Sequence, residues 1–313
     1  MLAISIMVLG GALLPVQTTF NSRLREAVGS PFLSSFVSFT GGTIFLVLLA
    51  TLVDGTFWFS PAAVAAEPAW IWLGGLLGVI GLTTNIFIFP QLGGVQAVIL
   101  PITGQILMGL ITDQFGFFNA PQKPLTPLRA AGVALVLAGV LAAVLLGKKK
   151  TAPSNMGGEM QPPSGILGWQ LLAVFTGFLM AMQSAINGYL GTVIGSGVKA
   201  ALVSFSVGTL VLLMIVLALR LTFRVTVPAG KVSNPFWMWA GGPLGATFVT
   251  LNALFVPLLG TGATIMAALT GMIAAFLVVD RFGIFEAQQR PVRLPQIAGL
   301  LVMLAGIALI RLT

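Results

Sequence analysis

The chain has 313 residues, of which 57% are hydrophobic and only 7% are charged, and its mean hydropathy is +1.05. This composition is typical of membrane proteins and excludes an ordinary soluble domain. The absence of cysteine and histidine excludes disulfides, thiol nucleophiles, imidazole acid–base chemistry and metal sites made of these residues. The net charge of +8 does not indicate nucleic-acid binding, because the basic residues lie in short loops between apolar runs and can meet anionic lipid headgroups there.

Five apolar runs in each half of the chain are long enough to cross a bilayer, which takes about 20 residues. They lie at about 2–20, 32–53, 69–89, 95–112 and 128–146, and again at 166–190, 198–219, 236–257, 262–279 and 295–310. No basic region precedes the first run, so we expect a permanent span and not a cleaved signal peptide. Only Gln91 to Gly94 separate the third and fourth runs, so we expect these two to form an antiparallel hairpin.

The one long polar segment lies between the fifth and sixth runs. Its sequence from Gly147 to Gly165 is GKKKTAPSNMGGEMQPPSG, which could not bury a core and predicts a flexible linker. We therefore expect a first five-span repeat at 1–146, a polar linker at 147–166 and a second five-span repeat at 167–313.

The two halves repeat each other. A shift of 166 residues places Gln17 on Gln183 and Asn21 on Asn187, and after one inserted residue a shift of 167 holds to the end. The second shift matches Trp70, Trp72, Gly74, Gly78, Asn85, Pro90 and Asp113 with Trp237, Trp239, Gly241, Gly245, Asn252, Pro257 and Asp280. Because each unit has an odd number of spans, the two copies must enter the membrane in opposite directions. The predicted fold is an all-α integral membrane protein of ten transmembrane helices in two inverted five-helix repeats.

Loop charges predict the orientation. Span counting assigns eleven Lys and Arg residues, including Lys148 to Lys150, to one side and four (Lys123, Arg129, Lys199 and Arg311) to the other. The positive-inside rule places the first side in the cytoplasm. We therefore expect both termini outside and the linker inside.

Amide side chains inside the runs are the candidate substrate-binding residues. They are Gln17, Asn21, Asn85, Gln105, Gln183, Asn187 and Asn252. Each Gln/Asn pair shares one helix face, because its members are four residues apart. The first pair belongs near the cytoplasmic end and the second near the outer end. An amide in hydrocarbon must find a partner or water, so these residues either bond neighbouring helices or line a pathway. Gln105 has no polar counterpart, since Met272 occupies its place.

Two aspartates, Asp113 and Asp280, end the fourth and ninth runs. A carboxylate in a last helical turn opposes the helix dipole. It either pairs with a nearby basic residue such as Arg129 or Arg281, or couples transport to a proton or cation. No run carries an acid near its centre, where a proton-coupled exchanger of cations usually needs one. The strings DQFG and DRFG indicate helix C-caps at Gly116 and Gly283, and the Gly74/Gly78 and Gly241/Gly245 pairs indicate close helix crossings.

The repeated strings resemble the YdcZ-like family of bacterial inner-membrane proteins, within the drug/metabolite transporter superfamily of two inverted five-span sets. They are the Gln-x-x-x-Asn of the first run, GSPFLSSFVSFTGG, GGLLGVIGLTTNIFIFPQLGG, GQILMGLITDQFG and the last run with Gly132 and Gly139. The match covers nearly the whole chain, which resembles a fused pair of the family's single five-span units. The resemblance implies a bacterial plasma-membrane transporter and no particular substrate. The small multidrug-resistance branch relies on a first-span glutamate, and the runs at 2–20 and 166–190 contain no acid, which argues against that antiport mechanism.

We therefore expect a carrier in the lipid bilayer that exports a small organic metabolite or drug-like solute by alternating access. Amide, hydroxyl and aromatic lining favours a polar neutral or zwitterionic solute. The alternatives are a passive pore, a lipid flippase and a membrane scaffold without transport. Without His or Cys the chain offers no nucleophile–base pair or metal set, so we expect no enzyme, no cofactor and no metal. The sequence leaves the substrate, the coupling ion and a homodimer open.

Overall fold

The computed structural model describes residues 2–145, 165–286 and 292–311. These residues form helices and no strand, as expected for an all-helical protein. In chain order the helices are α1 (Leu2–Gly11), α2 (Leu13–Val28), α3 (Pro31–Asp54), α4 (Gly74–Phe115), α5 (Pro127–Leu145), α6 (Ile166–Ile194), α7 (Gly197–Ala218), α8 (Gly241–Leu259), α9 (Thr261–Phe282) and α10 (Leu294–Arg311). Short 3-10 helices η1 to η5 lie at Pro61–Ala63, Ala69–Trp72, Phe117–Asn119, Phe236–Ala240 and Ile284–Glu286.

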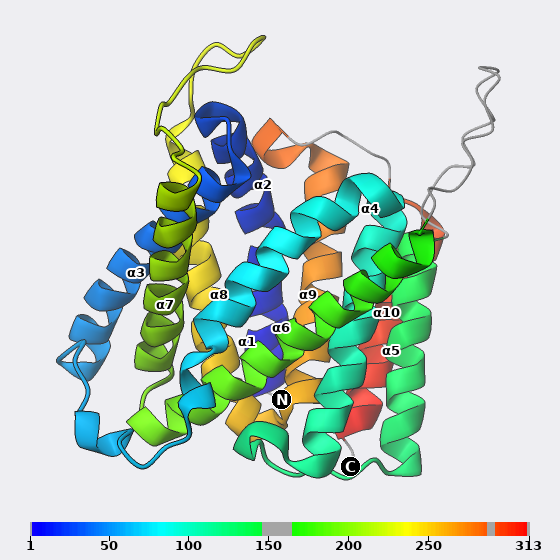
Figure 1. The fold of residues 1–313 in the computed structure, drawn as a ribbon. Helices are drawn as coiled ribbons and strands as arrows, with labels where there is room; N and C mark the ends of the chain where they lie inside the picture. Colours follow the sequence, from blue (N-terminus) through cyan, green and yellow to red (C-terminus); the bar gives the residue numbers. More distant parts are fainter. Residues whose placement is uncertain (1, 146–164, 287–291, 312–313) are drawn as a thin grey trace, which may run out of the picture.

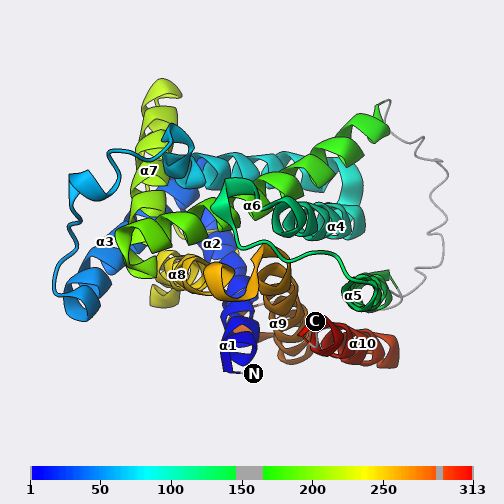
Figure 2. The same ribbon diagram turned by 90° about the horizontal axis from the view of Figure 1, so that it is seen from below.

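Eight stretches of the described residues are long and apolar enough to cross a membrane, and α10 contributes a shorter apolar helix at Leu294–Ile310. The two termini lie at the same end of the molecule, the lower end in Figure 1, and both face the viewer in Figure 2. The end of α5 and the start of α6 lie at the opposite end. Nearly all of the predicted 147–166 linker lies outside the described residues, so the linker and the boundaries drawn around it stay predictions.

The first predicted span, 2–20, is two helices with a break at Ala12. Pro15 has no N–H to donate to the carbonyl of Gly11, which weakens the helix there. The duplicate position in α6 is Ala181, and α6 runs unbroken from Ile166 to Ile194. The proline therefore accounts for this difference between the halves.

The third and fourth predicted spans are one helix by backbone hydrogen bonding, since α4 has 42 residues. A straight helix of that length would measure about 63 Å, twice the hydrocarbon thickness of about 30 Å. Figure 1 shows that α4 bends back on itself at the upper end, so the expected reversal of direction occurs without a break. In the second half Gly260, at φ 87° and ψ 161°, separates α8 from α9.

Helix ends follow the predicted signals. Gly116 and Gly283 take left-handed conformations after α4 and α9, with φ of 67° and 62°, which confirms the two predicted C-caps. Another connector recurs in both halves: a left-handed glycine ends one helix, and the next serine caps the following one. The Oγ of Ser30 accepts from Leu33 N, and the Oγ of Ser196 accepts from Lys199 N.

Helices of the first half pack mainly against helices of the second. The closest associations of this kind join α4 with α6, α5 with α10, α3 with α7 and α8, and α1 with α9. The largest apolar core contains Ile106 and Val136 from one half and Met266 and Met303 from the other, all at 0% exposure. The two halves therefore share a core.

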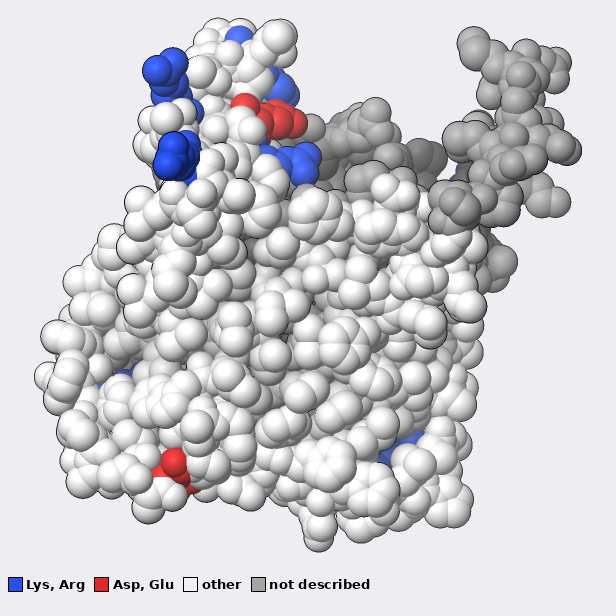
Figure 3. All heavy atoms as spheres, in the orientation of Figure 1, with Lys and Arg blue, Asp and Glu red and all other residues white. Residues whose placement is uncertain are grey.

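Charged side chains lie toward the two ends of the molecule. In Figure 3 the larger group lies at the upper end and a few show toward the lower end, with a broad belt between them that shows almost none. The described residues at the upper end include the exposed Arg25, Glu26, Arg220 and Arg224. Leu48, Leu52, Leu210 and Leu217 are exposed apolar residues of α3 and α7, as expected for helices that face lipid. The assignment of the upper end to the cytoplasm stays a prediction.

Candidate functional site

The predicted amide pairs lie against the predicted glycine pairs of the opposite half. On α2, Gln17 and Asn21 contact Gly245 and Gly241 of α8. A Cβ added at either glycine would come within 3.0 Å of the facing side chain, at Gln17 Nε2 and at Asn21 Oδ1. Each glycine therefore makes room for one amide. The amide pairs and the glycine pairs, which the sequence showed as separate features, form a single contact.

The same contact occurs a second time with the halves exchanged. On α6, Gln183 and Asn187 contact Gly78 and Gly74 of α4, and a Cβ at Gly78 would lie 2.7 Å from Gln183 Nε2. In Figure 1, α2 lies at the upper end and the C-terminal end of α6 at the lower end, so the two amide–glycine contacts lie toward opposite ends of the molecule.

The two asparagines are incompletely hydrogen-bonded. Asn187 is 1% exposed, and its Nδ2 donates to Ser204 Oγ at 3.3 Å. The Oδ1 atoms of Asn21 and Asn187 are buried and accept no hydrogen bond from the described residues. Both oxygens lie against a glycine Cα, where a weak C–H···O interaction is the available partner. Such carbonyls keep most of their capacity to accept a stronger donor.

Between α3 and α7, duplicate residues contact each other. The Oγ1 atoms of Thr43 and Thr209 lie 3.1 Å apart, and the rings of Phe39 and Phe205 stack with centroids 4.9 Å apart. Each ring covers a glycine of the facing helix, Gly208 for Phe39 and Gly42 for Phe205. Contacts between a residue and its own duplicate are what a two-fold relation between the copies predicts.

The other predicted amides are not part of these contacts. Asn252 is 3% exposed, and its Nδ2 donates to the carbonyl of Phe248 on its own helix at 3.0 Å. Gln105 is half-buried and lies where α4 crosses α6, its backbone N 2.7 Å from a Cβ built at Gly177. Asn85 lies within α4, and its side chain is outside the described part of the chain.

Asp113 is fully buried, and it joins the halves at the end that carries the termini. Its Oδ1 accepts from the backbone N–H of Thr261 at 2.6 Å, and its Oδ2 from that of Gly262 at 3.0 Å. Its Oδ2 also forms an ion pair with Arg129. The sequence offered Arg129 as a possible partner, as the alternative to a role in ion coupling. The carboxylate therefore opposes the dipole of α4 but caps the N-terminus of α9, where negative charge is favourable. The Asp280 side chain lies outside the described residues.

Two further acids of the first half bond to the second half. Asp54 Oδ2 accepts from Ser196 Oγ at 2.5 Å, and Glu67 Oε2 accepts from Tyr189 OH at 2.7 Å. Sequence reasoning missed both contacts, because no local pattern shows which hydroxyl a loop carboxylate will meet.

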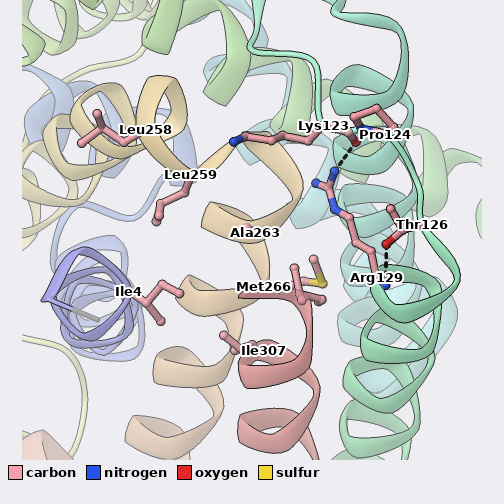
Figure 4. A pocket seen from close by; sticks show the side chains of 11 residues that line it. Ile4, Lys123, Pro124, Thr126, Arg129, Leu258, Leu259, Ala263, Met266 and Ile307 are labelled. Carbon is pink, nitrogen blue, oxygen red and sulfur yellow. Dashed lines mark hydrogen bonds between the residues drawn. The ribbon is translucent and has the colours of Figure 1, made fainter. Parts of the chain in front are cut away.

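A cavity of about 260 Å³ lies beside the Asp113–Arg129 pair. Figure 4 shows it between α1, α9, α10 and the loop that precedes α5. Its polar lining residues are Lys123, Thr126 and Arg129, and the remainder of its wall is apolar. The sequence assigned Lys123 and Arg129 to the outer side, but gave no sign that they share a cavity.

This geometry defines a multi-pass helical membrane protein whose two halves interlock through matching contacts. A family described as "Putative inner membrane exporter, YdcZ" matches residues 2–142 and again 168–309. The chain therefore belongs to this family, which confirms the resemblance seen in its sequence. The description names a membrane exporter and no enzyme. A crystal structure of a protein with 18% identical residues is similar in fold, with a TM-score of 0.69 over 99% of this chain and 96% of that one. No curated protein matches the chain.

Proposed function

We propose that the protein is a secondary transporter that exports a small organic solute by alternating access between two inverted repeats. The observation that carries this proposal is the pairing of contacts: Gln17 and Asn21 on Gly245 and Gly241, and Gln183 and Asn187 on Gly78 and Gly74. An inverted duplication with a two-fold axis in the membrane plane gives each contact an equivalent at the other side.

Paired contacts of this kind suit a rocking mechanism. Each amide–glycine contact joins one helix from each half, so rotation of one half against the other loosens one contact as it tightens the other. A loosened contact exposes an amide that can bind water or a polar solute. The Oδ1 atoms of Asn21 and Asn187, which accept no conventional hydrogen bond from the described part of the chain, are the acceptors best suited to this exchange.

The axis in this proposal passes close to Thr43 and Thr209. These residues should stay near each other in both access states, because points on an axis move least. The bonds of Asp54, Glu67 and Asp113 to the second half lie away from it. They would close the end that carries the termini, which the charge distribution assigns to the outside.

Flux through proteoliposomes tests the function. We would find a bound solute by a thermal-shift screen, since a ligand raises apparent stability, and then measure its flux against concentration. A carrier gives saturable, solute-specific flux and counterflow. Unsaturable, unselective flux would indicate a pore, flux of lipid alone a flippase, and no flux from folded protein a scaffold.

A further inference from the structure

The cavity beside Asp113 and Arg129 has a wall from each half of the chain. The first half contributes Ile4, Lys123, Pro124, Thr126 and Arg129, and the second half contributes residues that include Leu259, Ala263 and Met266. Figure 4 shows these apolar side chains facing a common space under the loop that carries Lys123. A cavity of about 260 Å³ is near the lower end of the usual size of small-molecule sites, about 300–1,000 Å³.

The charge available to a ligand in this cavity comes from Lys123. Arg129 is 4% exposed, pairs with Asp113 and donates to the Lys123 carbonyl, so its charge is already balanced. Among the described residues no carboxylate pairs with the Lys123 ammonium. Figure 4 shows the Lys123 side chain extending across the top of the cavity toward Leu259. The cavity thus combines an apolar wall with one positive charge at its edge that no described carboxylate pairs with.

Thr126 adds a hydroxyl to the cavity wall, on the side of Arg129 away from the Lys123 ammonium (Figure 4). Its Oγ1 accepts the backbone N–H of Arg129 at 3.2 Å, which leaves the hydroxyl proton free to donate. The Lys123 ammonium, which only donates, matches a carboxylate, which only accepts. Charge-assisted bonds of this kind are also the stronger ones.

We propose that this cavity binds an amphiphilic organic anion, with its carboxylate on the Lys123 ammonium and its apolar body against Ala263, Met266 and Ile307. As an assignment of substrate class the proposal rests on the transport function proposed above, whereas as a binding site it stands by itself. It differs from the sequence expectation of a neutral or zwitterionic solute, because that expectation considered amides, hydroxyls and aromatic rings and did not include Lys123.

Calorimetric titration of octanoate into the full chain, held in nanodiscs of neutral lipid, tests the site. Empty nanodiscs give the background from partition into the bilayer. We expect octanoate to bind. Octan-1-ol and octylammonium should bind at least about tenfold more weakly, a difference of about 1.4 kcal/mol in binding free energy. Lys123→Gln should weaken octanoate binding about tenfold, and Ala263→Trp should abolish it by filling the cavity.

The matched control is Lys199→Gln, which removes a lysine assigned to the same side of the membrane but outside the cavity lining, and it should leave binding unchanged. Lys123→Gln should fold, because the loop is held by the backbone of Lys123: its N–H donates to the Asp113 carbonyl at 2.8 Å, and its carbonyl accepts from Arg129. Repeating the titration in anionic nanodiscs separates two sources of the anion. If octanoate binds the unmodified chain more weakly in anionic than in neutral nanodiscs, and Lys123→Gln shows no such difference, an anionic lipid headgroup competes for the site. Equal octanoate affinity in the two kinds of nanodisc would show that the ligand comes from solution.

Equal affinity of the unmodified chain and Lys123→Gln for octanoate would overturn the proposal, as would equal affinity for octanoate and octylammonium. Binding that survives Ala263→Trp would locate the ligand elsewhere. Octanoate binding without any flux would keep the site and reject the transporter. Saturable flux of another solute by protein that does not bind octanoate would reject the site and keep the transporter.

Discussion

At the scale of single residues, the structure gives glycine and amide side chains a joint role. Gly74 lies under Asn187 and Ser204, and Gly241 lies under Asn21, so any larger residue would displace a buried carboxamide. The sequence showed both sets of residues at a spacing of four. It could not show that one set packs on the other, because that depends on how helices from different halves cross.

Replacing Gly74 or Gly241 by alanine should lower the free energy of unfolding by about 1–3 kcal/mol, because the added methyl group overpacks the contact. Chemical unfolding in mild detergent measures the change. Gly41→Ala is the control, since a Cβ there has nothing within 4 Å. In the Gly74→Ala background, truncating Asn187 to alanine should recover part of the loss. Strict additivity of the two changes would mean that the side chains are not coupled.

Asp113→Asn should cost about 3–5 kcal/mol of stability, because it leaves the buried Arg129 without its counterion. Glu26→Gln is the matched control: Glu26 lies 3.9 Å from Arg23 and its side chain is 50% exposed, so its loss should cost at most about 1 kcal/mol. The same unfolding experiment compares the two. An Asp113→Asn protein that stays equally stable but loses ion-driven uptake while keeping exchange would favour the coupling role.

At the scale of helices, the sequence located most elements to within a few residues, because each needs an apolar run of bilayer length. Two differences arose where proline and glycine act on the backbone. Pro15 divides the first predicted span into α1 and α2, and α4 stays helical through the predicted turn at Gln91 to Gly94. Such residues mark where a helix can bend or break, and tertiary packing decides which happens.

Gly260→Ala should destabilise the junction of α8 and α9 by about 1–3 kcal/mol. Gly260 has φ 87° and ψ 161°, a region that residues with a Cβ rarely adopt, and a Cβ there would also lie 2.9 Å from Asp113 Oδ2. The melting temperature of the variant should fall, whereas that of Gly168→Ala should not, since Gly168 has nothing within 4 Å of a built Cβ. An unchanged melting temperature for Gly260→Ala would contradict this account of the junction.

At the scale of the whole molecule, duplication was visible in the sequence because rare residue types repeat at a constant shift. The cavity was not visible, because its lining comes from α1, the loop before α5, the start of α5, α8, α9 and α10. No local pattern links these segments, and only the packed helices bring them together. The sequence therefore predicted the architecture better than the candidate site.

The orientation predicts the behaviour of fused reporters. A phosphatase that is active only outside the cytoplasm should be active when fused after Thr313, and a fluorescent protein that matures only inside should stay dark there. Placed within the 147–166 linker, the same two reporters should give the opposite results. A fluorescent C-terminal fusion would reverse the predicted orientation and leave the duplication untouched.

The central claim is that the two halves rock against each other and expose the two amide–glycine contacts alternately. The chain has no cysteine, so Asn21→Cys and Asn187→Cys each introduce a single reporter thiol for labelling by a water-soluble reagent from both sides of the membrane. Ser60→Cys, in an exposed loop, and Leu46→Cys, at 0% exposure, set the upper and lower limits of labelling. We predict that a transported solute supplied on one side raises labelling at one asparagine position and lowers it at the other. Two thiols that stay unreactive in every condition, or that rise and fall together, would contradict the account.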